Sequence, residues 1–280
     1  MICWQKCRKT KKMQEKTKIE LNSQRKTELS ELAEFIAMEY CPQGIVTPEI
    51  IAKQAGITYN YKNYGDCFDG VLGYDSKGFH IFINILNKNE AKIRFSFAHE
   101  LGHYFIDEHR NALMKGKSLH KSYHQYFRRN IVEKEADLFA SNLLMPQCRF
   151  LKSIGNKKFS ADMINSLMTE YNVSFTACAI RIINIDIYPI MIVFAENGNV
   201  KWKYSNPDFP YKRLRNDNIV PKDTVMGEYF YRNETDDIKK TVPVWAMDWF
   251  NQGKDEDTRK KFYEYCIAHQ NFALSVIWED

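Results

Sequence analysis

The sequence contains no apolar run that approaches the roughly 20 residues a helix needs to span a bilayer. Its first residues, MICWQKCRKTKKMQEK, also lack the apolar stretch and small-residue cleavage site of a secretory signal. These two absences predict no membrane segment and no export, so we expect a cytoplasmic protein.

Cysteine pairs of the CxxC type are absent as well. The seven cysteines are odd in number and widely spaced, which argues against a disulfide framework and against a structural zinc ribbon. We expect reduced thiols that mostly fill the core.

What the chain does contain is typical of a folded globular protein: 280 residues, 44% of them hydrophobic and 27% charged, enough for one or two domains. The net charge of +5 comes largely from residues 1–26. No aromatic residues alternate with these charges to stack on bases, so we expect a basic, flexible segment there and no direct nucleic-acid binding.

Hydrophobic spacing and turn residues divide the chain into helical and strand-like segments. Helical spacing predicts helices over 27–40, 47–56, 91–106, 132–145, 161–171 and 175–185. Alternation and turn residues predict strands over 57–61, 68–74 and 79–85, and a hairpin over 190–204 around a type I′ turn at Asn197-Gly198. The remainder is mostly strand-like, so we place a boundary near residue 187.

The decisive motif is HELGH at residues 99–103, an HExxH pattern within a predicted helix. Residues four apart lie one turn apart on the same helical face, so His99 and His103 can bind one ion with Glu100 beside them. A catalytic zinc ion needs three protein ligands and one open position. The motif therefore predicts a catalytic zinc site with Glu100 as general base.

Three residues compete for the third ligand position. His109 has the spacing of HExxHxxGxxH enzymes, but Ile106 replaces the glycine that makes their turn. Glu133 is preferred over Glu135, because it shares a helical face with small alanines that permit close approach to the HELGH helix. Asp137, one turn beyond Glu133, is the expected acceptor for a ligating imidazole.

The run RFSFAHELGH and the later run EKEADLFASNLLMP together resemble the ImmA/IrrE family of metallopeptidases, over about residues 27–187. Glu133 and Asp137 also resemble the ligand glutamate and supporting aspartate of gluzincins. The resemblance implies an α+β fold with a zincin-like core, in which a small antiparallel sheet packs on the HExxH helix. It further implies a zinc endopeptidase that cleaves a helix-turn-helix repressor of a mobile element or stress regulon, and in some members a GAF-like sensory domain follows.

In this chemistry Glu100 takes a proton from water and returns it to the leaving amine. A second electrophile is needed for the oxyanion, and the residues between the two zinc helices are the nearest candidates in sequence. They are His120, Tyr123, His124 and Tyr126.

Two other classes of function compete with the peptidase. A DNA-binding regulator is suggested by the basic segment and by the helix pair around Asn172, although the second helix offers only Arg181 to read bases. A sensor or interaction protein with a vestigial metal site is the other, and the presence of Glu100 argues against it. We predict a peptidase domain with a helical extension over 27–187 and a mixed, strand-rich domain over 188–280 that is sensory or substrate-binding.

Overall fold

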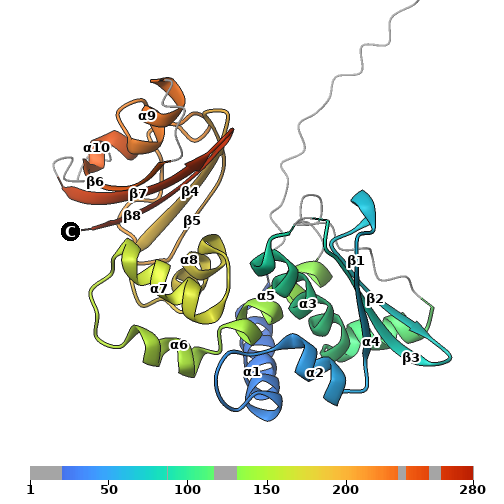
Figure 1. Cartoon of the computed structure of the whole chain (residues 1–280). Coiled ribbons are helices and arrows are strands. Elements are labelled where there is room, and N and C mark those ends of the chain that lie inside the picture. The colour runs from blue at the N-terminus through green and yellow to red at the C-terminus, as the bar shows by residue number, and fades with distance from the viewer. Residues whose placement is uncertain (1–20, 87, 117–130, 233–237, 252–259, 280) are drawn as a thin grey trace, which may run out of the picture.

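The structure is a computed structural model that describes residues 21–86, 88–116, 131–232, 238–251 and 260–279. Helices α1 to α5 and a three-stranded sheet form one part of the molecule, and a five-stranded sheet forms the other part (Figure 1). Helices α7 and α8 lie between the two parts. In the described part of the chain, no helix combines the length and the apolar character needed to cross a membrane.

The N-terminal helices begin at well-formed caps. Helix α1 (Ser23–Tyr40) starts earlier than the predicted residue 27, because the Asn22 side chain accepts a hydrogen bond from the Arg25 amide at 2.7 Å. Helix α2 (Pro48–Gln54) has the predicted proline in its first turn. The basic residues before position 21 lie outside the described part of the chain.

The small sheet contains β1 (Thr58–Lys62), β2 (Gly70–Asp75) and β3 (Gly78–Asn84) in the order β1-β3-β2, with a short 3₁₀ helix η1 (Gly65–Cys67) between β1 and β2. The expectation of an antiparallel sheet was wrong in part. Strands β2 and β3 form the predicted hairpin, but β1 pairs with the far side of β3 and runs parallel to it. Because β3 is central, both β1 and β2 are edge strands.

Two long helices pack against each other beneath this sheet. Helix α3 (Glu90–Phe105) carries the HELGH motif, and helix α5 (Ile131–Leu144) carries Glu133. No helix was predicted in the polar segment after α3, yet it forms helix α4 (Asp107–Met114). Two acidic residues in its first turn favour the helix, because they complement the positive end of the helix dipole.

Three helices connect the two parts of the molecule: α6 (Gln147–Ile154), α7 (Ala161–Tyr171) and α8 (Phe175–Asn184). Helix α6 was not predicted. Arg181 of α8 is only 3% exposed, and its Nε donates to the Met145 carbonyl oxygen at 3.1 Å. The one residue that this helix pair offered for reading bases is therefore buried.

The C-terminal sheet is antiparallel throughout, in the order β5-β4-β8-β7-β6. The predicted type I′ turn is confirmed by the positive φ values of Asn197 (50°) and Gly198 (73°). The elements of this part are β4 (Ile190–Glu196), β5 (Asn199–Ser205), α9 (Val225–Tyr231), β6 (Ile238–Trp245), α10 (Ala246–Trp249), β7 (Lys261–His269) and β8 (Phe272–Glu279).

Each face of the five-stranded sheet contributes to a different core. One face packs on the helical extension, where the rings of Phe175 and Tyr265 lie 5.5 Å apart and those of Phe159 and Trp278 lie 5.0 Å apart. The opposite face forms a second apolar cluster with side chains that include Trp249. The sheet is thus covered on both sides.

Candidate metal centre

The site depends on an unusually close approach of α3 to α5. A Cβ atom added to Gly102 would lie 3.1 Å from Phe139 Cδ1 and 3.2 Å from the Ala136 Cα. Glycine within the HELGH motif and alanine on α5 therefore let the two backbones meet. This contact brings the first turn of α5 beneath the motif histidines.

Three buried side chains meet at this crossing. The Nε2 atoms of His99 and His103 lie 3.1 Å apart, and Glu133 Oε2 lies 3.2 Å from His99 Nε2. The distance from Glu133 Oε1 to His103 Nε2 is 3.7 Å. These three residues form the group that can hold a metal ion among the described residues.

The spacing of this group fits zinc. With zinc–ligand distances of about 2.0–2.1 Å and tetrahedral angles, neighbouring ligand atoms lie about 3.3 Å apart. The separations of 3.1, 3.2 and 3.7 Å within the group are close to that value. Three protein ligands would leave the fourth position for water or substrate.

The outer nitrogen of His99 faces a carboxylate, because Asp137 Oδ1 lies 2.9 Å from His99 Nδ1. With a metal ion bound, this contact would keep the ring proton on Nδ1 and leave Nε2 free for the ion. Asp137, on α5 one turn after Glu133, thus has the position that the sequence predicted. Burial lowers the pKa of His99, but Asp137 and Glu133 outweigh burial and raise this pKa to about 10 in the metal-free protein.

The other two ligand candidates lie elsewhere. His109 stands behind His103, with the two Nδ1 atoms 3.1 Å apart, so its ring is on the side of His103 away from the His99 contact. Glu135 Oε2 lies 2.9 Å from His109 Nε2. His109 and Glu135 contact each other and do not join the group of three. Burial, with His99 and His109 nearby, lowers the pKa of His103.

Glu100 is 1% exposed and lies against strand β2. A Cβ atom at Gly70 would come within 2.8 Å of Glu100 Oε1 and 3.0 Å of its Cγ. The charge of Glu100 also contributes to the raised pKa of His99, after the larger effects of burial, Asp137 and Glu133. The carboxylate therefore lies between the histidine group and the edge strand β2.

Strand β2 has one edge paired with β3, and no other described strand pairs with it. Such an edge offers backbone donors and acceptors to an extended peptide. The proposed oxyanion residues His120, Tyr123, His124 and Tyr126 lie outside the described part of the chain.

Sequence reasoning missed two features of this site. Gly70 was not singled out, although a glycine at the start of a strand is a signal for close approach of a neighbouring group. Arg25, which contacts Glu135, was assigned to the basic segment. No local pattern connects Arg25 to a residue 110 positions away.

Two histidines from one helix, a glutamate from a second helix and a buried carboxylate beside an edge strand are the features of a metallopeptidase centre. Residues 52–182 match the model of the IrrE N-terminal-like domain of the M78 peptidases. The predicted resemblance to the ImmA/IrrE family is thus confirmed over this segment.

One similar solved structure is a transcriptional regulator from Mycobacterium tuberculosis, with a TM-score of 0.61 and 14% sequence identity. The alignment covers 90% of this chain and 76% of the regulator. At this identity the likeness shows a shared fold. No match was found among curated proteins.

Proposed function

We propose that this protein is a zinc-dependent endopeptidase with His99, His103 and Glu133 as metal ligands and Glu100 as general base. The observation that carries the proposal is the convergence of three buried ligand atoms at separations of 3.1–3.7 Å. The peptidase domain that matches residues 52–182 supports the same assignment.

The chain's own residues divide the chemistry among them. Zinc at this site would polarise water and the scissile carbonyl as a Lewis acid. Glu100 would take a proton from the water and deliver it to the leaving nitrogen. Asp137 would keep the His99 ring oriented, and the free edge of β2 would pair with an extended substrate segment beside Glu100.

For the substrate we propose a protein, and specifically a helix-turn-helix repressor of a mobile element or stress regulon. The family resemblance supports this class, and the similarity of the fold to that of a transcriptional regulator is compatible with it. We further propose that residues 188–280 form a separate sensory or substrate-binding domain. The apolar cluster on one face of their antiparallel sheet supports a domain with a core of its own, and the other face packs against the helical extension.

The test combines metal analysis with cleavage of a repressor encoded near the gene. Wild type should bind one zinc per chain, and His99→Ala and Glu133→Ala should lose it. Glu100→Gln should keep zinc and lose cleavage by at least about 100-fold, because general base catalysis contributes on that order or more. Full zinc binding by both ligand variants would contradict the proposal, and unchanged cleavage by Glu100→Gln would remove Glu100 from the mechanism.

The same variants address the two competing functions. A vestigial site predicts zinc binding without cleavage in wild type and in Glu100→Gln alike. A DNA-binding regulator predicts tight, salt-sensitive binding to one duplex in a gel-shift assay. The burial of Arg181 argues against base reading by the α7–α8 pair.

A further inference from the structure

A chain of hydrogen-bonding groups extends from His103 away from the metal group. His103 Nδ1 lies 3.1 Å from His109 Nδ1, and His109 Nε2 lies 2.9 Å from Glu135 Oε2. Glu135 in turn accepts from Arg25, with Nε–Oε1 at 2.8 Å and Nη2–Oε2 at 3.1 Å. These hydrogen bonds therefore connect α3 to α4, α4 to α5 and α5 to α1.

The direction of each hydrogen bond follows from its two ends. A histidine that binds metal through Nε2 carries its proton on Nδ1, so His103 donates to His109 Nδ1. His109 must then be neutral with its proton on Nε2, and it donates that proton to Glu135. Arg25 cannot accept a hydrogen bond, so Glu135 is held as a carboxylate that accepts from both sides.

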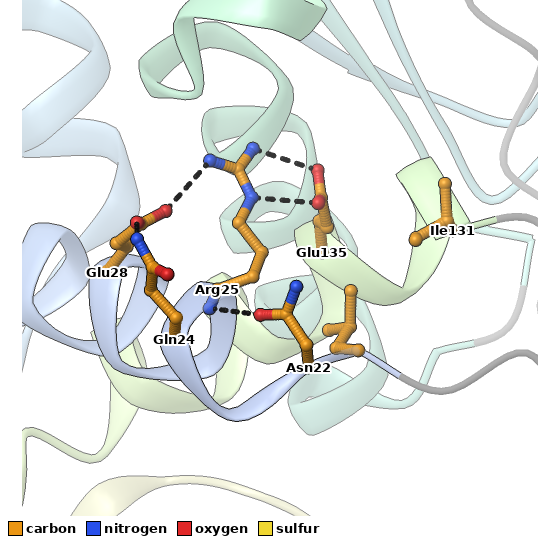
Figure 2. A pocket seen from close by; sticks show the side chains of 7 residues that line it. Asn22, Gln24, Arg25, Glu28, Ile131 and Glu135 are labelled. Atoms are coloured by element: carbon orange, nitrogen blue, oxygen red, sulfur yellow. Dashed lines mark hydrogen bonds and ion pairs between the residues drawn. The ribbon is translucent and has the colours of Figure 1, made fainter.

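Arg25 holds Glu135 in a two-bonded, charge-assisted contact, the geometry in which guanidinium is most selective for carboxylate (Figure 2). The Glu135 side chain is 11% exposed and that of Arg25 is 22% exposed. Arg25 also reaches Glu108 at 3.2 Å, near the start of α4, next to His109. One guanidinium thus contacts the helix that carries His109 and the helix that carries Glu135.

The two metal-binding histidines are supported differently. His99 contacts the Asp137 carboxylate directly, and the Asp137 side chain is 48% exposed. His103 reaches its carboxylate through a second imidazole, and that carboxylate is buried against an arginine. Arg25 lies outside the residues 52–182 that match the peptidase domain, so α1 adds a contribution to the metal centre from outside that segment.

We propose that His109, Glu135 and Arg25 are positioning residues that orient His103 for metal binding and thereby tie helix α1 to the metal centre. This inference rests on the proposed function, because it assumes that His103 binds the metal through Nε2. It assigns Glu135 and His109 a role in place of the ligand role considered from the sequence.

The test uses the full-length protein with Co²⁺ in place of zinc, because the visible spectrum of Co²⁺ reports the geometry of its ligands. His109→Leu removes both the acceptor for His103 and the donor to Glu135. His109→Gln restores both, because the side-chain amide has an oxygen that accepts and an N–H that donates. His109→Leu should weaken metal binding by about 10–100-fold and shift the Co²⁺ bands, as loss of such supporting contacts does elsewhere. His109→Gln should recover most of both signals.

Arg25→Met tests the last group in this series of hydrogen bonds, and Arg25→Lys keeps the positive charge without the two-bonded contact. We expect Arg25→Met to weaken binding by about threefold to tenfold, less than His109→Leu because it acts through two further groups. The matched control is Glu28→Gln. Glu28 is another carboxylate near Arg25, with Nη1–Oε2 at 3.5 Å, but it is not one of the groups that connect Arg25 to His103. This variant should bind Co²⁺ like wild type.

The outcomes separate this inference from the proposed function. If His109→Leu binds Co²⁺ with the same spectrum as wild type and Glu28→Gln, and with an affinity within twofold of theirs, the positioning role is overturned and the metal site stands. If only Arg25→Met matches the control, the link to α1 is overturned. If wild type binds no Co²⁺, or binding survives His99→Ala unchanged, the proposed metal site fails first.

Discussion

Among the described residues, the metal centre and the surroundings of Glu264 both bury ionisable groups, and the two clusters differ in how their acceptors are satisfied. In the C-terminal sheet, the completely buried Glu264 accepts four hydrogen bonds. Its donors are the amides of Val225 and Met226, the Trp249 indole and the Ser275 hydroxyl, at 2.5–3.0 Å. Each carboxylate oxygen has two donors.

The metal centre has the opposite arrangement. The contacts of His99 with Asp137 and of His103 with His109 place the ring protons on the outer nitrogens. With a metal ion bound, the two Nε2 atoms and the Glu133 carboxylate would then be free acceptors, and they lie 3.1–3.7 Å apart. Such converging acceptors need a cation between them, which is a metal ion or, in the metal-free protein, the extra proton that the raised pKa of His99 indicates.

The comparison distinguishes a structural charge from a functional one. A buried carboxylate surrounded by protein donors needs nothing more, so Glu264 is explained by the fold itself. The metal centre instead needs an added cation, and the arrangement of His99, His103 and Glu133 is one that can hold a metal ion.

The largest expected effect is the response of folding stability to zinc. At a zinc concentration about 1,000 times the dissociation constant, the folded state should gain about 4 kcal/mol. His103→Ala should abolish this gain, and Glu264→Gln should retain it. Chemical denaturation of chelator-treated protein with and without zinc measures both. An equal gain in His103→Ala would show that the zinc binds elsewhere.

The next effect concerns Gly70, whose lack of a side chain leaves room for Glu100. Gly70→Ala would place a Cβ atom 2.8 Å from Glu100 Oε1 and displace the carboxylate. Because small misplacements of catalytic groups cost up to about 100-fold, we expect kcat to fall by about 10–100-fold with zinc content unchanged.

Gly73→Ala is the matched control on the same strand. Its Cβ atom would meet Phe82 at 3.6 Å and the His80 carbonyl oxygen at 3.8 Å, which are ordinary contacts. It should retain kcat. Equal activity of both variants would show that Glu100 tolerates the displacement.

These two regions also differ in how much the sequence predicts. The HELGH helix was predictable because helical periodicity alone places His99 and His103 on one face. Glu133 was preferred over Glu135 because of its small helical neighbours, and the structure places Glu133 beside the two histidines.

Other features depend on contacts that local patterns do not encode. The parallel pairing of β1 with β3 follows from where the chain enters the sheet. The four donors to Glu264 come from three segments separated by 11–39 residues from it. A carboxylate on a predicted strand gives no sign that it will be buried among them.

Loss of the Glu264 charge should have a smaller effect than loss of zinc. Glu264→Gln keeps the size of the side chain but presents an amide N–H₂ group to one pair of donors. The Ser275 hydroxyl can turn to accept from it, whereas the Met226 amide cannot. Leaving one buried donor unsatisfied should cost about 1–3 kcal/mol in the free energy of unfolding.

The control is Glu279→Gln on the neighbouring strand β8. It changes a partly exposed carboxylate whose Oε1 lies 2.7 Å from Lys260 Nζ. Surface pairs of this kind contribute about 1 kcal/mol or less. Urea denaturation of both variants without zinc gives the two costs. A Glu264→Gln variant as stable as wild type would show that the four hydrogen bonds contribute no more than burial of the carboxylate costs.

The smallest expected effect is the pH dependence of that same cost. Burial raises the pKa of Glu264 above its ordinary value of 4.5, although the hydrogen bonds from Ser275, Trp249, Val225 and Met226 oppose the rise. Between 4.5 and the higher folded-state pKa, the folded protein binds more protons than the unfolded chain. Its stability therefore falls as pH rises through this window.

The difference in unfolding free energy between wild type and Glu264→Gln should accordingly shrink as the pH rises from about 4 toward neutrality. Urea denaturation at several pH values measures it, and a difference that grows over that range would mean that the donors outweigh burial and lower the pKa.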